Sequence, residues 1–226
     1  FPPGRPVYYD GYSYTLAISY IIFRNFVNIS FEKFSIYFIA VYAAIVAIPA
    51  FFLARFLTKS NLAGLLSAFL ITLSPAFLIV SMAGYVDSDV VYVFYTYLSI
   101  LSTLLLIERF YSLKIDFIKR HNISKVIYLT PYFLFVIISY IIFAWNWNSA
   151  YYFLHFLVFF ILFYGFLKVF LLPFFKLSNS KEGLKEIINL SILLFIPLFL
   201  TEIITRIIEV TLYIILPKPI ETLLSQ

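Results

Sequence analysis

Two aspartates, Asp87 and Asp89, stand two residues apart in the segment GYVDSD, which begins at Gly84 and lies between two apolar stretches. Carboxylate oxygens are the ligands that Mg²⁺ and Mn²⁺ prefer, so this pair could grip one divalent cation. Gly84 permits a tight turn, and a helix that begins near Asp87 favours negative charge at its N-terminus. Because Asp and Ser are also common helix N-caps, the pattern alone leaves a metal site and a simple helix cap both open.

The composition indicates which solvent surrounds these carboxylates. Of the 226 residues, 63% are hydrophobic and 12% are charged, and the mean hydropathy is +1.00. A soluble domain is about 45–50% apolar and about 25% charged. These values predict an all-α bundle of transmembrane helices, because helices satisfy their own backbone hydrogen bonds in lipid. The absence of cysteine excludes disulfides and thiolate metal sites.

Apolar windows near the length that crosses a bilayer, roughly 20 residues as helix, recur along the chain. They cover residues 34–57, 62–82, 90–111, 126–144, 150–172 and 187–216. The last is longer than one upright crossing needs, so we expect a crossing to about Leu200 and then a helix at or above the interface. We therefore predict a transmembrane domain of about six crossings over residues 34–226.

The first 33 residues have a different character. Pro2, Pro3, Gly4 and Pro6 break regular structure. A short apolar stretch at residues 12–26 is rich in Tyr and Ser, and tyrosine is favoured at the membrane surface. We therefore predict that residues 1–33 form an external loop with an interfacial helix.

Basic residues predict the orientation of the chain. One set of predicted loops holds Arg55, Lys59, Arg109, Lys114, Lys119, Arg120, Lys125, Lys168, Lys176, Lys181 and Lys185. The opposite set holds the two aspartates and the Trp145–Asn148 link. The positive-inside rule places the basic set in the cytoplasm. We therefore expect a multi-pass plasma-membrane protein with its acidic site outside, and the net charge of +5 needs no nucleic-acid partner.

Three further side chains are candidates for contacting a substrate. Trp145 and Trp147 could stack on a sugar, although interfacial anchoring is the more ordinary explanation for tryptophans at this position. Arg206 could bind a lipid phosphate, because charges at membrane depth often serve function. Its spacing from Glu202 and Glu209, four and three residues, also suits an ion-paired stripe on one helix face.

The acidic segment, extended back to Met82 as MAGYVDSD, resembles the second acidic motif of the oligosaccharyltransferase catalytic subunits, in which a Gly precedes an acidic pair. The resemblance extends back to Pro49 and to the segment SFE that begins at Ser30, at spacings similar to those of bacterial members. It extends forward to Trp145, near which the family has a Trp-containing external turn. It covers roughly residues 6–172.

This resemblance implies a membrane domain of the GT-C glycosyltransferase type, followed by a soluble domain. The family moves an oligosaccharide from a polyprenyl (dolichyl) phosphate or diphosphate to the Asn amide of Asn-x-Ser/Thr. Asp87 and Asp89 match the motif, so the resemblance assigns them Mg²⁺ or Mn²⁺ binding and a catalytic role. The implied partners are a lipid-linked oligosaccharide, an acceptor polypeptide and membrane lipid. A divalent ion suits a phosphate leaving group, whose developing charge it neutralises.

The chain departs from the family pattern at several points. Val80 stands where members often carry Arg, and we interpret Asp10 as a turn residue. The first acidic motif and the Trp-Trp-Asp motif are not seen, and Glu221 is the remaining candidate for the external-loop glutamate. We therefore expect a fragment that is inactive by itself. Two alternatives stay open: another GT-C enzyme such as a protein O-mannosyltransferase, and a transporter, which would favour broken helices at mid-membrane.

Overall fold

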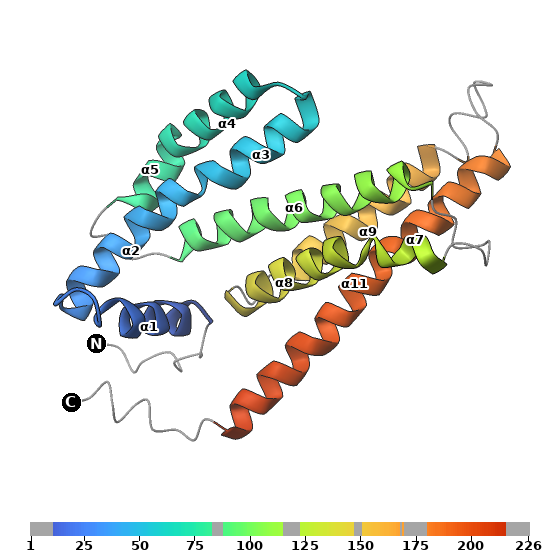
Figure 1. Ribbon diagram of the computed structural model, residues 1–226. Coiled ribbons are helices and arrows are strands. Elements are labelled where there is room, and N and C mark those ends of the chain that lie inside the picture. The colour runs from blue at the N-terminus through green and yellow to red at the C-terminus, as the bar shows by residue number, and fades with distance from the viewer. Residues whose placement is uncertain are drawn as a thin grey trace, which may run out of the picture.

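The computed structural model describes residues 11–82, 88–114, 123–146, 151–167, 169 and 180–215. Helices are the only regular elements among these residues, and Figure 1 shows how they are arranged. They are α1 (Gly11–Phe23), α2 (Phe31–Ile45), α3 (Ala47–Thr58), α4 (Asn61–Leu73), α5 (Pro75–Ser81), α6 (Asp89–Ser112), α7 (Ile123–Ile127), α8 (Thr130–Asn146), α9 (Tyr151–Phe166) and α11 (Ser180–Ile215). The predicted all-α architecture is confirmed, and α1 corresponds to the helix predicted before the first crossing.

Four stretches within the described residues are long and apolar enough to cross a membrane. They are Phe31–Thr58, Asp89–Ser112, Lys125–Asn146 and Gly183–Ile208. The pair α4 and α5 makes a fifth if the two helices, bent by 58°, are counted as one span. The predicted polytopic membrane bundle is therefore confirmed. The prediction of about six crossings stays a prediction.

Prolines explain where the predicted windows are interrupted. The first window forms two helices that meet at Val46, and Pro49 in the second has no N–H to bond the carbonyl four residues back. In the second window, Pro75 begins α5, and the Ser74 side chain accepts a hydrogen bond from the Phe77 N–H at 3.3 Å. This bond satisfies one of the amides that the break exposes. By contrast, α11 continues through Pro197 to Ile215, so the predicted crossing and its extension beyond Leu200 form one helix.

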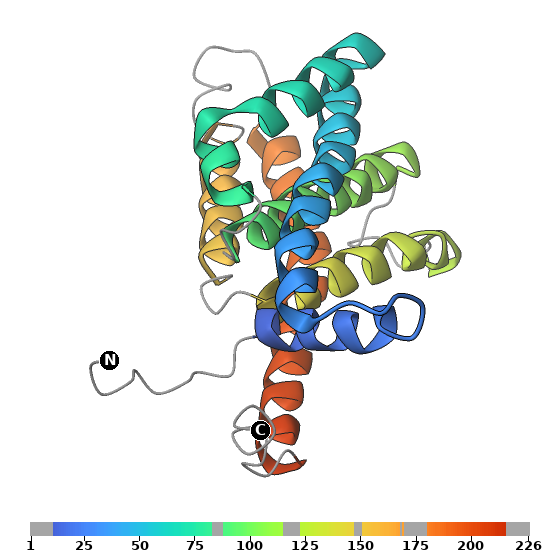
Figure 2. The same cartoon turned by 90° about the vertical axis from the view of Figure 1, so that its left-hand side faces the viewer.

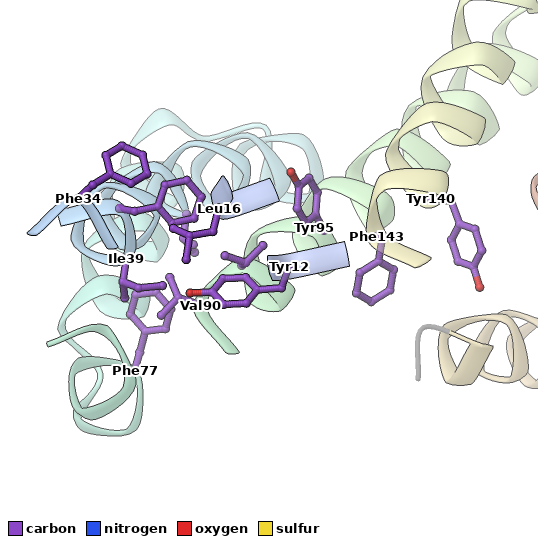
Figure 3. Close-up of a cluster of buried hydrophobic side chains, with 12 residues drawn as sticks. Tyr12, Leu16, Phe34, Ile39, Phe77, Val90, Tyr95, Tyr140 and Phe143 are labelled. Atoms are coloured by element: carbon purple, nitrogen blue, oxygen red, sulfur yellow. The ribbon is translucent and has the colours of Figure 1, made fainter. Parts of the chain in front are cut away.

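Two clusters of buried side chains hold the bundle together. The first, which we call the acidic-end cluster, joins α1, α2, α5, α6 and α8 (Figure 3). Its members are Tyr12, Leu16, Phe34, Phe38, Ile39, Val46, Phe77, Val90, Val91, Tyr95, Tyr140 and Phe143. The second, the basic-end cluster, joins α6, α8, α9 and α11. Its members are Leu106, Phe110, Leu129, Val136, Leu157, Leu190, Leu193, Leu194 and Leu198.

Small polar residues line the contact between α6 and α8, which lie side by side in Figure 1. Ser99, Ser102 and Thr103 of α6 and Ser139 of α8 are all buried. The hydroxyl oxygens of Ser102 and Ser139 lie 2.9 Å apart. Small side chains let transmembrane helices approach closely, and hydroxyl pairs add hydrogen bonds across the interface. Close approach of α6 and α8, as well as burial of apolar surface, therefore stabilises the centre of the bundle.

Charged side chains of three helices make contacts at one end of the bundle. At one end, Lys59 and Glu108 form an ion pair of 3.2 Å between the end of α3 and the end of α6. At the same end, Glu186 of α11 accepts hydrogen bonds from Tyr111 at 3.0 Å and from Tyr164 at 2.7 Å. Asp89 begins α6 at the opposite end. The predicted segregation of charge and the assignment of sides to cytoplasm and exterior both stay predictions.

Candidate active site

Asp89 is the first residue of α6 and is exposed, while the next two residues are completely buried. Val90 and Val91 both have 0% exposure and belong to the acidic-end cluster. Ser88 precedes the helix in the αR conformation, and its side chain makes no capping hydrogen bond. Packing, rather than a serine cap, therefore fixes the start of α6, and this leaves the Asp89 carboxylate at the surface. Asp87 lies outside the described residues.

The short helix α5 leads the chain into the acidic segment and belongs to the same packing. Phe77 is buried in the acidic-end cluster, and Val80 packs against it. Val80, which stands where the resemblance led us to expect Arg, therefore has an apolar environment. Asp89 thus follows one helix that is packed in the acidic-end cluster, α5, and begins another, α6.

The end of α8 meets the beginning of α1 beside this cluster. Asn146 is 1% exposed, and its Oδ1 accepts a hydrogen bond from the Thr15 hydroxyl at 3.0 Å. Its Nδ2 donates to the Ile142 carbonyl at 2.8 Å. The contact is so close that a Cβ on Gly11 would overlap both the backbone and the ring of Trp145. A glycine at position 11 is therefore required for this approach.

Figure 3 shows how α1 closes the acidic-end cluster. The ring of Tyr12 lies in the picture between Val90 and Phe143, with Leu16 on the same helix. All four side chains are buried in one cluster. Burial of apolar surface stabilises such a cluster by about 25 cal/mol per Å², although helices that already lie in lipid gain chiefly from close packing. The start of α6 therefore belongs to the same buried cluster as side chains of α1 and α8.

Trp145 is half-buried near the end of α8, in a setting that the sequence did not indicate. Its ring lies 5.9 Å from the ring of Tyr14 of α1, with an interplanar angle of 52°. Such tilted pairs are favourable, and this one ties α1 to α8. Stacking of Trp145 on a sugar stays a prediction. Trp147 lies outside the described residues.

Arg206 is exposed on α11, and its Nε lies 3.1 Å from Oε1 of Glu202. This i,i+4 pair is the ion-paired stripe that the spacing indicated. Binding of a lipid phosphate by Arg206 stays a prediction. The side chain of Glu209 lies outside the described residues, as does the whole of Glu221.

Metal binding at the acidic pair stays a prediction. Among the described residues, no group of three or more His, Cys, Asp and Glu side chains could hold a metal ion. Asp87 is not among these residues. Asp89 supplies an exposed carboxylate at a helix N-terminus, a donor of the kind that Mg²⁺ and Mn²⁺ prefer. The carboxylate chemistry of the pair therefore fits a divalent cation.

Sequence reasoning missed Gly11, Thr15 and Asn146, which dock α1 on α8. The sequence offered one signal, Asn146, which stands between two tryptophans. Tryptophans that only anchor a helix at the membrane surface do not need an amide side chain between them. Gly11 gave no such signal, since a glycine after an aspartate is typical of an ordinary turn. Its role depends on a contact with a residue far along the chain.

An all-α bundle with several membrane spans and an exposed acidic residue at one end defines the chain as a polytopic membrane protein. Comparison with known families narrows this class. The family model described as "Oligosaccharyl transferase STT3, N-terminal" matches residues 1–218, so the chain belongs to the oligosaccharyl transferase family. No curated protein and no solved structure matches the chain. Membership implies glycosyl transfer in protein N-glycosylation, and it confirms the resemblance found in the acidic segment.

Proposed function

We propose that this chain forms the membrane part of an enzyme that transfers an oligosaccharide from a polyprenyl phosphate or diphosphate to the asparagine of Asn-x-Ser/Thr. The family match over residues 1–218 carries the proposal. It also favours this function over a protein O-mannosyltransferase or a transporter. The reaction is divalent-metal dependent and takes place at the external face of the plasma membrane.

In this proposal Asp87 and Asp89 hold Mg²⁺ or Mn²⁺. When bound, the cation supplies charge neutralisation for the lipid phosphate that leaves. Asp89 also suits the site by its location, because it is exposed at the end of the bundle while Val90 and Val91 anchor its backbone in the core. An anchored carboxylate keeps its place as the lipid-borne donor and the acceptor peptide come and go. The amide nitrogen of the acceptor is a poor nucleophile, and a carboxylate that accepts a hydrogen bond from the amide helps to activate it.

The proposal is tested in the full-length protein with Asp87→Asn and Asp89→Asn combined. The measurement is transfer of glycan from a lipid-linked donor to a sequon peptide in the presence of Mn²⁺. We expect transfer to fall by about 100-fold or more, because the change removes both anionic ligands while keeping the side-chain size. Metal-dependent transfer at the wild-type rate would refute the assignment.

Glu108→Gln is the matched control for this experiment. It makes the same change from carboxylate to amide, but at the basic end of the bundle, where Glu108 is an exposed partner of Lys59. Exposed ion pairs of this kind contribute about 0–1 kcal/mol to stability. We expect the Glu108→Gln enzyme to retain its transfer rate, so a loss confined to the aspartate variant identifies the acidic site rather than the loss of any carboxylate.

A further inference from the structure

The start of α1 has a closer contact with the rest of the bundle than an interfacial helix needs. A Cβ on Gly11 would overlap the carbonyl oxygen and the ring of Trp145. One turn later, the Thr15 hydroxyl donates to Oδ1 of the buried Asn146 at 3.0 Å. A helix that only rested on the membrane surface would not require a glycine at this contact, nor a hydrogen bond to a buried amide.

The same turn of α1 supplies two side chains to the cluster that anchors α6. Tyr12 and Leu16 are 8% and 7% exposed, and they share the acidic-end cluster with Val90 and Val91 (Figure 3). Asp89 directly precedes these two valines. Figure 2 shows α1 lying across the bundle at the ends of α2 and α8. A displacement of α1 from α8 would therefore disturb the cluster that contains the two residues after Asp89.

We propose that α1 is a positioning element for Asp89, docked by Gly11 against Trp145 and by Thr15 against Asn146. Tyr12 and Leu16 then complete the packing around Val90 and Val91. This packing fixes the position of the Asp89 carboxylate at the start of α6. These residues act through Asp89 and touch no reacting atom. The inference rests on the proposed metal-binding role of Asp89. Residues that orient a metal ligand from behind typically affect metal affinity by about 10- to 100-fold.

The test is the Mn²⁺ concentration that gives half-maximal binding to the full-length protein, followed by electron paramagnetic resonance of the free ion and compared among four variants. Gly11→Ala should raise this concentration about 10-fold or more, because the added methyl group pushes α1 away from Trp145. Thr15→Val should raise it by a smaller factor, since it keeps the shape but removes the hydroxyl, which lies within hydrogen-bond distance of Asn146 Oδ1 and of the Gly11 carbonyl. Thr15→Ser restores the hydroxyl and should restore the wild-type value. Gly165→Ala is the matched control, because the nearest atoms to a Cβ there belong to the Ile187 side chain and lie 3.4 Å away or more.

The half-maximal Mn²⁺ concentration separates positioning from stability. A purely structural defect lowers the amount of folded enzyme and leaves that concentration unchanged. Wild-type values for both Gly11→Ala and Thr15→Val would overturn the inference, and if Gly11→Ala does not fold, Thr15→Val alone decides. Asp89→Asn is measured in parallel: a large rise there with unchanged α1 variants defeats only this inference, whereas a wild-type value for Asp89→Asn defeats the proposed function and this inference with it.

Discussion

Replacement of Ser139 by alanine and by leucine separates two physical reasons for the α6–α8 contact. Ser139 is 1% exposed and faces Ser102, which is 0% exposed, with their hydroxyl oxygens 2.9 Å apart. Each hydroxyl oxygen also lies 3.0 Å from a carbonyl oxygen of its own helix, Ser102 from that of Ser99 and Ser139 from that of Val136. Because each hydroxyl has one proton, one of the two donates across the interface while the other donates to its own helix. When Ser139 is replaced, the Ser102 hydroxyl can still donate to the Ser99 carbonyl, so it is not left without a partner.

The magnitudes follow from this geometry. Hydrogen bonds between transmembrane helices contribute about 0.6 kcal/mol on average. Ser139→Ala should therefore reduce the free energy of unfolding by about that amount. Ser139→Leu must place a larger side chain at a fully buried contact, and overpacking of this kind costs about 1–3 kcal/mol. We expect the leucine variant to be clearly the less stable of the two.

Unfolding of the purified protein in mixed micelles, titrated with a denaturing detergent, measures both changes. Ser112→Leu serves as the control, because Ser112 is exposed at the end of α6 and the same substitution there should change stability by less than about 0.5 kcal/mol. An alanine variant as unstable as the leucine variant would contradict this reasoning. It would mean that the hydrogen bond, and not the close approach of the helices, holds α6 to α8.

Two further predictions concern the ends of the bundle. Glu186→Leu should lower the free energy of unfolding by about 1–2 kcal/mol, because Tyr111 and Tyr164 both lose their carboxylate acceptor, whereas Glu186→Gln keeps an acceptor and should cost less. Detergent unfolding measures the difference, and equal losses would contradict it. Because the chain contains no cysteine, single cysteines report membrane sidedness directly. An impermeant maleimide should label Asn25→Cys in intact cells and Ser112→Cys only after permeabilisation, and the reverse pattern would refute the predicted orientation.

The fold class could be predicted from composition and from the length of the apolar windows. A chain this apolar lies in lipid, where helices of this length satisfy their own backbone hydrogen bonds. The breaks at Val46 and Ser74 coincide with nearby prolines, so local chemistry could have indicated them. The continuity of α11 through Pro197 could not be predicted from the residues next to it in sequence. We attribute it to tertiary packing, in which the neighbouring Leu194 and Leu198 are buried. Tertiary contacts of this kind override the local preference of a single residue.

The sequence predicted only those residues of the candidate site whose own type and spacing indicate chemistry. Asp89 was found because an acidic pair between apolar stretches is unusual. Gly11, Thr15 and Asn146 were missed because their importance arises from pairing of α1 with α8, and no short pattern encodes a contact between segments so far apart in sequence. The two predicted roles of Trp145, interfacial anchoring and stacking on a sugar, likewise did not include its ring contact with Tyr14.

The most direct measurement of the central claim is Mn²⁺ binding, followed by electron paramagnetic resonance as the ion is titrated into the purified full-length protein. Binding to carboxylates immobilises the ion and broadens its signal, so the free ion can be counted. We predict one site in the wild-type protein, competed by Mg²⁺ and weakened at least about 10-fold by Asp89→Asn, with no change in Glu108→Gln. Equal Mn²⁺ affinity in the wild-type and Asp89→Asn proteins would contradict the account.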